Sequence, residues 1–224
     1  MKSDGRTDFK FPFRVFRLVP WENSKLEKRG WRGVVYKADT EKGVICLKVL
    51  RNKVPGTSLK SEAEMLKKAN AVGVGPKLLG YDRKMEAIAM EFAGGEAFGK
   101  WVGSAPGARI RKVVLDVLSQ AKRLDGAGID HGQLSSAPKH IIVGKKIVLI
   151  DFERGSSARK PHNFNSLLSF LVLNPNSETA RLVRKAFGLE LGEIKKLVAD
   201  GCDVVRLLSA TPAESTCRSS RRRS

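Results

Sequence analysis

Two carboxylates stand directly after a run of β-branched, apolar residues in the second half of this chain. The run covers residues 147–150, and Asp151 and Glu153 follow it on either side of Phe152. A strand that ends on an aspartate projects that carboxylate from the edge of its sheet, and hard cations such as Mg²⁺ take carboxylate oxygens as ligands. The loop His131-Gly132-Gln133-Leu134 lies a short way upstream. Together these segments predict a metal-nucleotide site.

A lone lysine is a second candidate for chemistry. Lys48 alternates with apolar residues in the segment 45–49. A buried ammonium group is unfavourable unless it has a charged partner or meets an anionic ligand. Lys48 is therefore either a binding residue for an anion or a solvated lysine on an edge strand.

The first half of the chain, which must position Lys48, is predicted to form a small sheet with one helix. Strands are expected at 34–37 and 43–50, joined by a hairpin at 39–43, and at 77–81 and 86–92, joined by a turn at 82–84. Ser58 is expected to cap a helix whose apolar residues continue to Ala69, before Gly73 and Gly75 end it.

The second half predicts a mainly helical region that holds one further hairpin. Apolar residues between Ile110 and Leu124 recur at helical spacing, which predicts a long amphipathic helix that ends near Gly126 and Gly128. Strands are expected at 140–143 and 147–150 around a turn at 144–146, followed by helices at 165–173, 177–187 and 191–208. The sequence thus predicts the α+β class.

Composition and charge limit the classes of function. The chain has 224 residues, and its 42 Lys and Arg against 23 Asp and Glu give a formal net charge of +19. This charge favours anionic partners such as nucleotide, nucleic acid or acidic protein, although a basic, well-solvated surface is the alternative. The three cysteines form no metal or disulfide pattern, and neither a signal peptide nor a membrane span is expected. We expect a soluble cytoplasmic protein without membrane contact.

The order of these parts, a β-rich lobe with one helix and then a helical lobe with a hairpin, resembles the protein-kinase fold. The resemblance is nearest to the small archaeal atypical Ser/Thr kinases, such as the RIO kinases and the KEOPS-complex kinase. It implies a bilobal kinase-like fold with an antiparallel N-terminal lobe at 1–93, a reduced helical C-terminal lobe at 94–208 and a disordered basic tail at 209–224.

The resemblance implies that Mg-ATP binds in the cleft of this fold. Gly30 and Gly33 resemble part of the kinase glycine loop, and Val35 would cover the adenine. Lys48 would contact the α- and β-phosphates and pair with Glu62, because helical periodicity turns Glu64 off that face. The segment Met90-Glu91-Phe92-Ala93 resembles the hinge, where main-chain groups of Glu91 and Ala93 would bind adenine.

The loop at His131 resembles the kinase catalytic loop, with one substitution that affects the chemistry. Gln133 stands where kinases place the aspartate that accepts the proton of the acceptor hydroxyl, and an amide cannot act as a base. Asp130 is the alternative base, or a residue that caps the loop. His140 stands before the following strand, where it is either a metal ligand or a structural residue.

Asp151-Phe152-Glu153 resembles the D-F-G segment of kinases, in which the aspartate binds Mg²⁺. Glu153 replaces the glycine and is either a second metal ligand or a partner of Arg154. The resemblance implies an atypical ATP-dependent Ser/Thr protein kinase whose protein substrate is unknown. The alternatives are phosphorylation of a small molecule and a pseudokinase or ATPase-like module that acts in an RNA-associated complex, with the basic surface as a contact for RNA or ribonucleoprotein.

Overall fold

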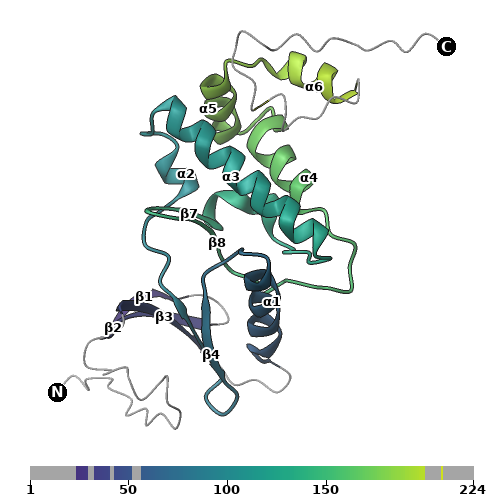
Figure 1. Cartoon of the computed structure of the whole chain (residues 1–224). Helices are drawn as coiled ribbons and strands as arrows, with labels where there is room; N and C mark the ends of the chain where they lie inside the picture. The colour runs from purple at the N-terminus through teal and green to yellow at the C-terminus, as the bar shows by residue number, and fades with distance from the viewer. Residues whose placement is uncertain (1–23, 30–32, 41–42, 52–56, 200–207, 209–224) are drawn as a thin grey trace. The chain divides into compact units, whose positions relative to one another are not determined.

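The computed structural model of this protein describes residues 24–29, 33–40, 43–51, 57–199 and 208 (Figure 1). The chain divides into two compact units. The first ends at Lys67 and resumes from Pro76 to Phe92, whereas the second comprises Lys68–Gly75 and the chain from Ala93 onward. Gly30 and the basic tail at 209–224 lie outside the described residues.

Five antiparallel strands form the sheet of the first unit. They lie side by side in the order β1-β2-β3-β5-β4, and their bounds are β1 (Ser24–Arg29), β2 (Gly33–Thr40), β3 (Gly43–Leu50), β4 (Leu78–Asp82) and β5 (Ala87–Glu91). The Thr40 hydroxyl donates to the Gly43 carbonyl at 2.6 Å, and Gly43 has a φ of 112°. The predicted hairpin between β2 and β3 is therefore confirmed, and a glycine suits its turn.

Helix α1 (Lys60–Ala71) follows β3 and packs its first turns on one face of this sheet (Figure 1). Leu59 and Ala63 form a buried cluster with Leu50 and Ile88 of the strands. The Ser58 hydroxyl accepts a hydrogen bond from the Lys60 N–H at 3.1 Å, as expected of a residue that caps a helix. The predicted position of this helix is confirmed.

The second unit is mainly helical and contains a small sheet in the order β6-β7-β8. Helix α3 packs against α4 and α5, as Figure 1 shows. The remaining bounds are β6 (Glu96–Ala97), α2 (Phe98–Trp101), α3 (Gly107–Gly126), β7 (Ile141–Val143), β8 (Ile147–Leu149), α4 (Asn163–Leu168), α5 (Glu178–Phe187) and α6 (Leu191–Ala199). The predicted long helix and second hairpin are present.

The structure corrects several predicted bounds. The helix expected at 165–173 begins at Asn163, and its second half, Ser169–Leu173, winds as a π-helix. The helix expected at 191–208 is described to Ala199, and residues 200–207 lie outside the described part. The elements β1, β6 and α2 have no counterpart in the expected set, because β1 is mostly charged, whereas β6 and α2, with two and four residues, are too short to show a period.

The predicted α+β class is confirmed, with the expected kinase-like order of a β-rich region that holds one helix and then a helical region that holds a hairpin. Among the residues that the structure describes, every helix is too short or too polar to cross a bilayer.

Candidate functional site

The first unit buries an ion pair between a strand and a helix. The Lys48 ammonium, on β3, donates to Glu62 Oε1 of α1 at 2.8 Å and lies 2.7 Å from Oε2. Both side chains are buried, with exposed fractions of 11% and 6%. Glu64 lies on the opposite side of the helix, where it is exposed and lies 3.7 Å from the Lys60 ammonium. The structure thus brings together the two residues that the kinase resemblance pairs.

Two further predicted residues of β2 lie beside Lys48 in the sheet. Val35 is the direct cross-strand neighbour of Lys48, and Gly33 opposes Leu50. Directly opposed residues share a face of the sheet, so Val35 and Lys48 lie on the same side. A Cβ at Gly33 would lie 3.1 Å from the Val49 carbonyl oxygen and 3.5 Å from Lys48 Cγ. The glycine therefore lets β2 approach the Val49 carbonyl closely, whereas a Cβ would be in ordinary van der Waals contact with the stem of Lys48.

The two predicted hinge residues lie where the chain passes from the first unit to the second. Glu91 ends β5, and its N–H donates to the Lys77 carbonyl at 2.8 Å. An adenine contact through Glu91 would therefore have to use its carbonyl oxygen. Ala93 begins the part of the chain that belongs to the second unit, and it is half-buried.

His131 is a fully buried residue of the loop before the 3₁₀ turn Leu134–Lys139. Its Nε2 lies 3.1 Å from the Ile150 carbonyl oxygen, and its ring centroid lies 4.6 Å from that of Phe152. Burial, with a smaller contribution from His140, lowers the pKa of His131 to about 4. The imidazole is therefore neutral at pH 7, and Nε2 carries the proton that it donates to Ile150.

The lowered pKa of His131 predicts a loss of stability in mild acid. The pKa of His131 is 6.5 in the unfolded chain and about 4 in the folded chain. The contribution of neutral His131 to the free energy of unfolding is therefore fully present above pH 6.5 and is lost as the pH falls to about 4. The loss is on the order of 3 kcal/mol. Urea unfolding of the parent and of His131→Phe between pH 7 and pH 4 measures it. The variant should show a shallower decline, and equal declines would contradict the assignment.

Asn163 and Asp125, which sequence reasoning missed, hold this loop in place. Asn163 accepts from the His131 N–H at 2.8 Å and donates through Nδ2 to the Ile129 carbonyl at 2.6 Å and to Asp125 Oδ1 at 2.7 Å. Asp125 also accepts from the N–H groups of Asn163 and Phe164, both at 2.9 Å. Both residues form hydrogen bonds with groups that are distant in the sequence. Such bonds leave no local pattern, so no sequence signal marks these residues.

Asp130 is buried and is held by an arginine of the segment that follows Asp151. Its Oδ2 accepts a hydrogen bond from Arg159 Nε at 2.9 Å and lies 2.9 Å from Arg159 Nη2 in an ion pair. The backbones of Asp130 and Ser156 also exchange two hydrogen bonds of 2.8 Å. Arg159 further donates to the Arg154 carbonyl at 2.6 Å. The segment 154–159 is therefore fixed to the loop that carries both candidate acceptor-orienting residues.

Gln133 lines a cavity of about 360 Å³ within the second unit. Its Oε1 is buried and has no hydrogen-bond partner among the described residues. A buried acceptor without a donor costs about 1–3 kcal/mol, a cost that a water or a bound group with an O–H or N–H would remove. The other lining residues are Asp130, Gly132, Leu134, Ser135, Arg159, His162, Asn163 and Ser166.

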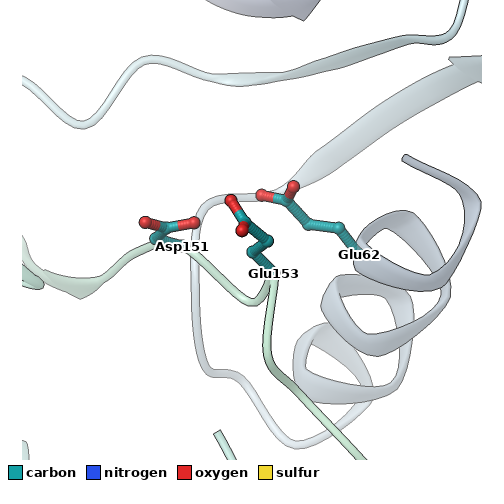
Figure 2. Close-up of side chains that lie close together, drawn as sticks. All are labelled: Glu62, Asp151 and Glu153. Atoms are coloured by element: carbon teal, nitrogen blue, oxygen red, sulfur yellow. The ribbon is translucent and has the colours of Figure 1, made fainter. Parts of the chain in front are cut away.

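Asp151 and Glu153 follow β8 on one loop, as Figure 2 shows, and the carboxylate oxygens of the two lie within 4.8 Å of each other. The same figure labels Glu62 on α1 of the other unit. Asp151 has a φ of 73°, a left-handed conformation that is uncommon without glycine and that concentrates at functional sites. His140 is buried, and its Nδ1 lies 3.8 Å from Asp151 Oδ2. Two carboxylates so close to each other suit a hard divalent cation.

Comparisons with known proteins find a sequence relative and solved structures that are similar to this chain. No family model matches the chain. A curated relative from Methanocaldococcus jannaschii, called uncharacterized protein MJ1211, is 29% identical over 106 residues, which are 47% of this chain and 90% of the relative. The solved structure of vaccinia related kinase 3 is similar with a TM-score of 0.45 and 13% identity, over 58% of this chain. This chain spans 46% of the length of that kinase structure.

Proposed function

We propose that this chain is an atypical Ser/Thr protein kinase that transfers the γ-phosphate of ATP to a protein hydroxyl with Mg²⁺. The observation that carries the proposal is the buried ion pair of Lys48 and Glu62 in the first unit. A buried ion pair is a weak source of stability, because desolvation offsets the attraction between its charges. Its position on β3 and α1 is the one that the kinase resemblance gives to the lysine that contacts phosphates.

The remaining nucleotide contacts follow the same resemblance. Gly33 and Val35 lie beside Lys48 on β2 and are proposed to cover the phosphates and the adenine. In the second unit, Asp151 is proposed as the ligand of Mg²⁺, with Glu153 as a further carboxylate within 4.8 Å. A bound Mg²⁺ would neutralise phosphate charge. His140 Nδ1 lies 3.8 Å from Asp151 Oδ2, beyond direct hydrogen-bond distance, so His140 would orient that carboxylate through a bridging water.

The acceptor hydroxyl is proposed to enter the cavity at Gln133. Oε1 of Gln133 is buried in this structure, so the side chain would turn towards the cavity for Oε1 to accept a hydrogen bond from that hydroxyl and orient it. An amide cannot remove the proton, so the hydroxyl proton would pass to an oxygen of the transferred phosphoryl group as the new O–P bond forms and the bond from the γ-phosphorus to ADP breaks. Phosphoryl transfer depends mainly on positioning and on charge neutralisation, so the reaction is slower without a base but remains possible.

A second candidate function is an ATP-binding module that transfers no phosphate. Gln133 at the position of the base favours it, and so does the engagement of Asp130 Oδ2 by two nitrogens of Arg159. Such a module would act through a partner. The formal net charge of +19 favours RNA or a ribonucleoprotein, which would bind with a steep dependence on salt.

Incubation with γ-labelled ATP and Mg²⁺ distinguishes the two candidates. The kinase proposal predicts label on serine or threonine of protein, and Asp151→Asn should reduce the initial rate by at least about 100-fold because it removes one charge from the metal ligand. Glu64→Gln removes a charge from an exposed residue and serves as the matched control with an unchanged rate. ATP binding by the parent without any transfer would instead support the binding module.

A further inference from the structure

Glu86 joins three elements of the first unit at one point, although it lies outside the residues proposed to contact nucleotide. Its Oε2 accepts from the Ser58 hydroxyl at 2.9 Å and from the Leu59 N–H at 2.8 Å. Its Oε1 accepts from the Tyr81 hydroxyl at 3.0 Å. Its own carbonyl oxygen accepts from the Leu50 N–H at 3.0 Å. One residue thus links the end of β3, the strand β4 and the start of α1.

We propose that Glu86 is a positioning residue that sets the distance between Lys48 and Glu62. Leu50 is two residues after Lys48 on β3, and Leu59 is three residues before Glu62 at the start of α1. Glu86 accepts a hydrogen bond from each of these residues: its backbone carbonyl accepts from the Leu50 N–H, and its carboxylate accepts from the Leu59 N–H. The expected effect of Glu86 on ATP binding rests on the proposed function, whereas its effect on the position of α1 does not.

The backbone of Glu86 indicates that the carboxylate is needed at this position. Glu86 has a φ of 51°, in the left-handed region that glycine adopts more easily than glutamate. A residue other than glycine in this region costs of order 1 kcal/mol or more and persists where its surroundings determine it. A glycine would suit the turn better. The hydrogen bonds of the carboxylate offset this strain and explain why a glutamate stands there.

The chemistry at the start of α1 also fits this role. The first N–H groups of a helix have no partner within the helix, and the positive end of the helix dipole attracts an anion. Ser58 satisfies the N–H of Lys60, while Glu86 satisfies that of Leu59 from 27 residues away. Hydrogen bonds to a carboxylate are stronger than neutral ones. Glu86 therefore holds the first turn of α1 against the sheet, one turn before Glu62.

The test compares the full chain with Glu86→Gly, which suits the turn but lacks the carboxylate, and with Glu86→Gln, which keeps the length but lacks the charge. The first readout is the rate at which an amine-acetylating reagent modifies Lys48, resolved by mass spectrometry, together with amide hydrogen exchange at residues 59–63. Glu86→Gly should raise both rates by roughly tenfold or more, and Glu86→Gln should raise them less. Glu64→Gln, on the same helix, should leave both unchanged.

The second readout is the Kd for Mg-ATP, in single and double variants. Glu86→Gly should raise the Kd by roughly tenfold in the parent, but should raise it no further in a Glu62→Gln background, because Glu86 acts through Glu62. Parent-like acetylation and exchange rates in Glu86→Gly, or fully additive effects in the double variant, would overturn the proposal. If the parent does not bind Mg-ATP, the kinase proposal fails, while the acetylation and exchange rates still decide the role of Glu86.

Discussion

Replacing Lys48 with methionine is expected to lower the free energy of unfolding by about 3–5 kcal/mol and to remove binding of Mg-ATP. The Glu62 side chain is 6% exposed, so the variant leaves its charge buried without the ammonium group 2.7 Å away. Chemical denaturation followed by circular dichroism measures the first effect. Titration with Mg-ATP measures the second.

A double variant separates these two effects. Lys48→Met combined with Glu62→Leu replaces the whole ion pair with apolar side chains, a change that is often neutral for stability when the packing is good. This double variant should therefore recover most of the lost stability and still fail to bind Mg-ATP. If Lys48→Met alone is as stable as the parent, the ion pair is not buried as described. If the double variant binds Mg-ATP, Lys48 is not part of the nucleotide site.

Replacing Gln133 with aspartate is expected to increase phosphoryl transfer by about 100-fold or more, the range that a general base contributes. The side chain at this position lines the cavity proposed for the acceptor, and a carboxylate there can take the proton that an amide cannot. The affinity for ATP should not change, because Gln133 has no proposed contact with the nucleotide. Initial rates with labelled ATP measure the gain.

The matched control for this variant is Gln133→Asn, which has the same length as aspartate but no basic oxygen. Asparagine should give no gain over the parent. If the Gln133→Asp and Gln133→Asn variants transfer phosphate at the same rate, the side chain at position 133 does not face the acceptor hydroxyl. In that case Asp130, freed from its ion pair by Arg159→Met, becomes the residue to test as the base.

The parts of the fold that the sequence predicts are those in which a local pattern reflects burial. Lys48 and Glu62 illustrate this: alternation along β3 and helical spacing along α1 give the face on which each side chain lies, and the kinase resemblance pairs the two. Strand β1 shows the limit. It carries mostly charged residues and forms through backbone pairing with β2, which no side-chain period reveals.

The same limit applies to the candidate site. The roles of Asn163 and Glu86 arise from hydrogen bonds to residues 27 to 38 positions away. Asp130 likewise meets Arg159 only because the backbones at 130 and 156 pair. A sequence pattern can therefore identify the residues that carry chemistry, whereas the residues that hold them in position depend on the folded chain.

Calorimetric titration of ATP into the full chain, with Mg²⁺ and with EDTA, is the sharpest test of the proposed nucleotide site. We expect saturable binding of one ATP per chain that Mg²⁺ strengthens. Asp151→Asn should make this binding independent of Mg²⁺, and Lys48→Met should remove it. Glu64→Gln should bind as the parent does. Absence of saturable ATP binding by the folded parent, or binding that neither Lys48→Met nor Asp151→Asn alters, would contradict the assignment of a kinase-like nucleotide site.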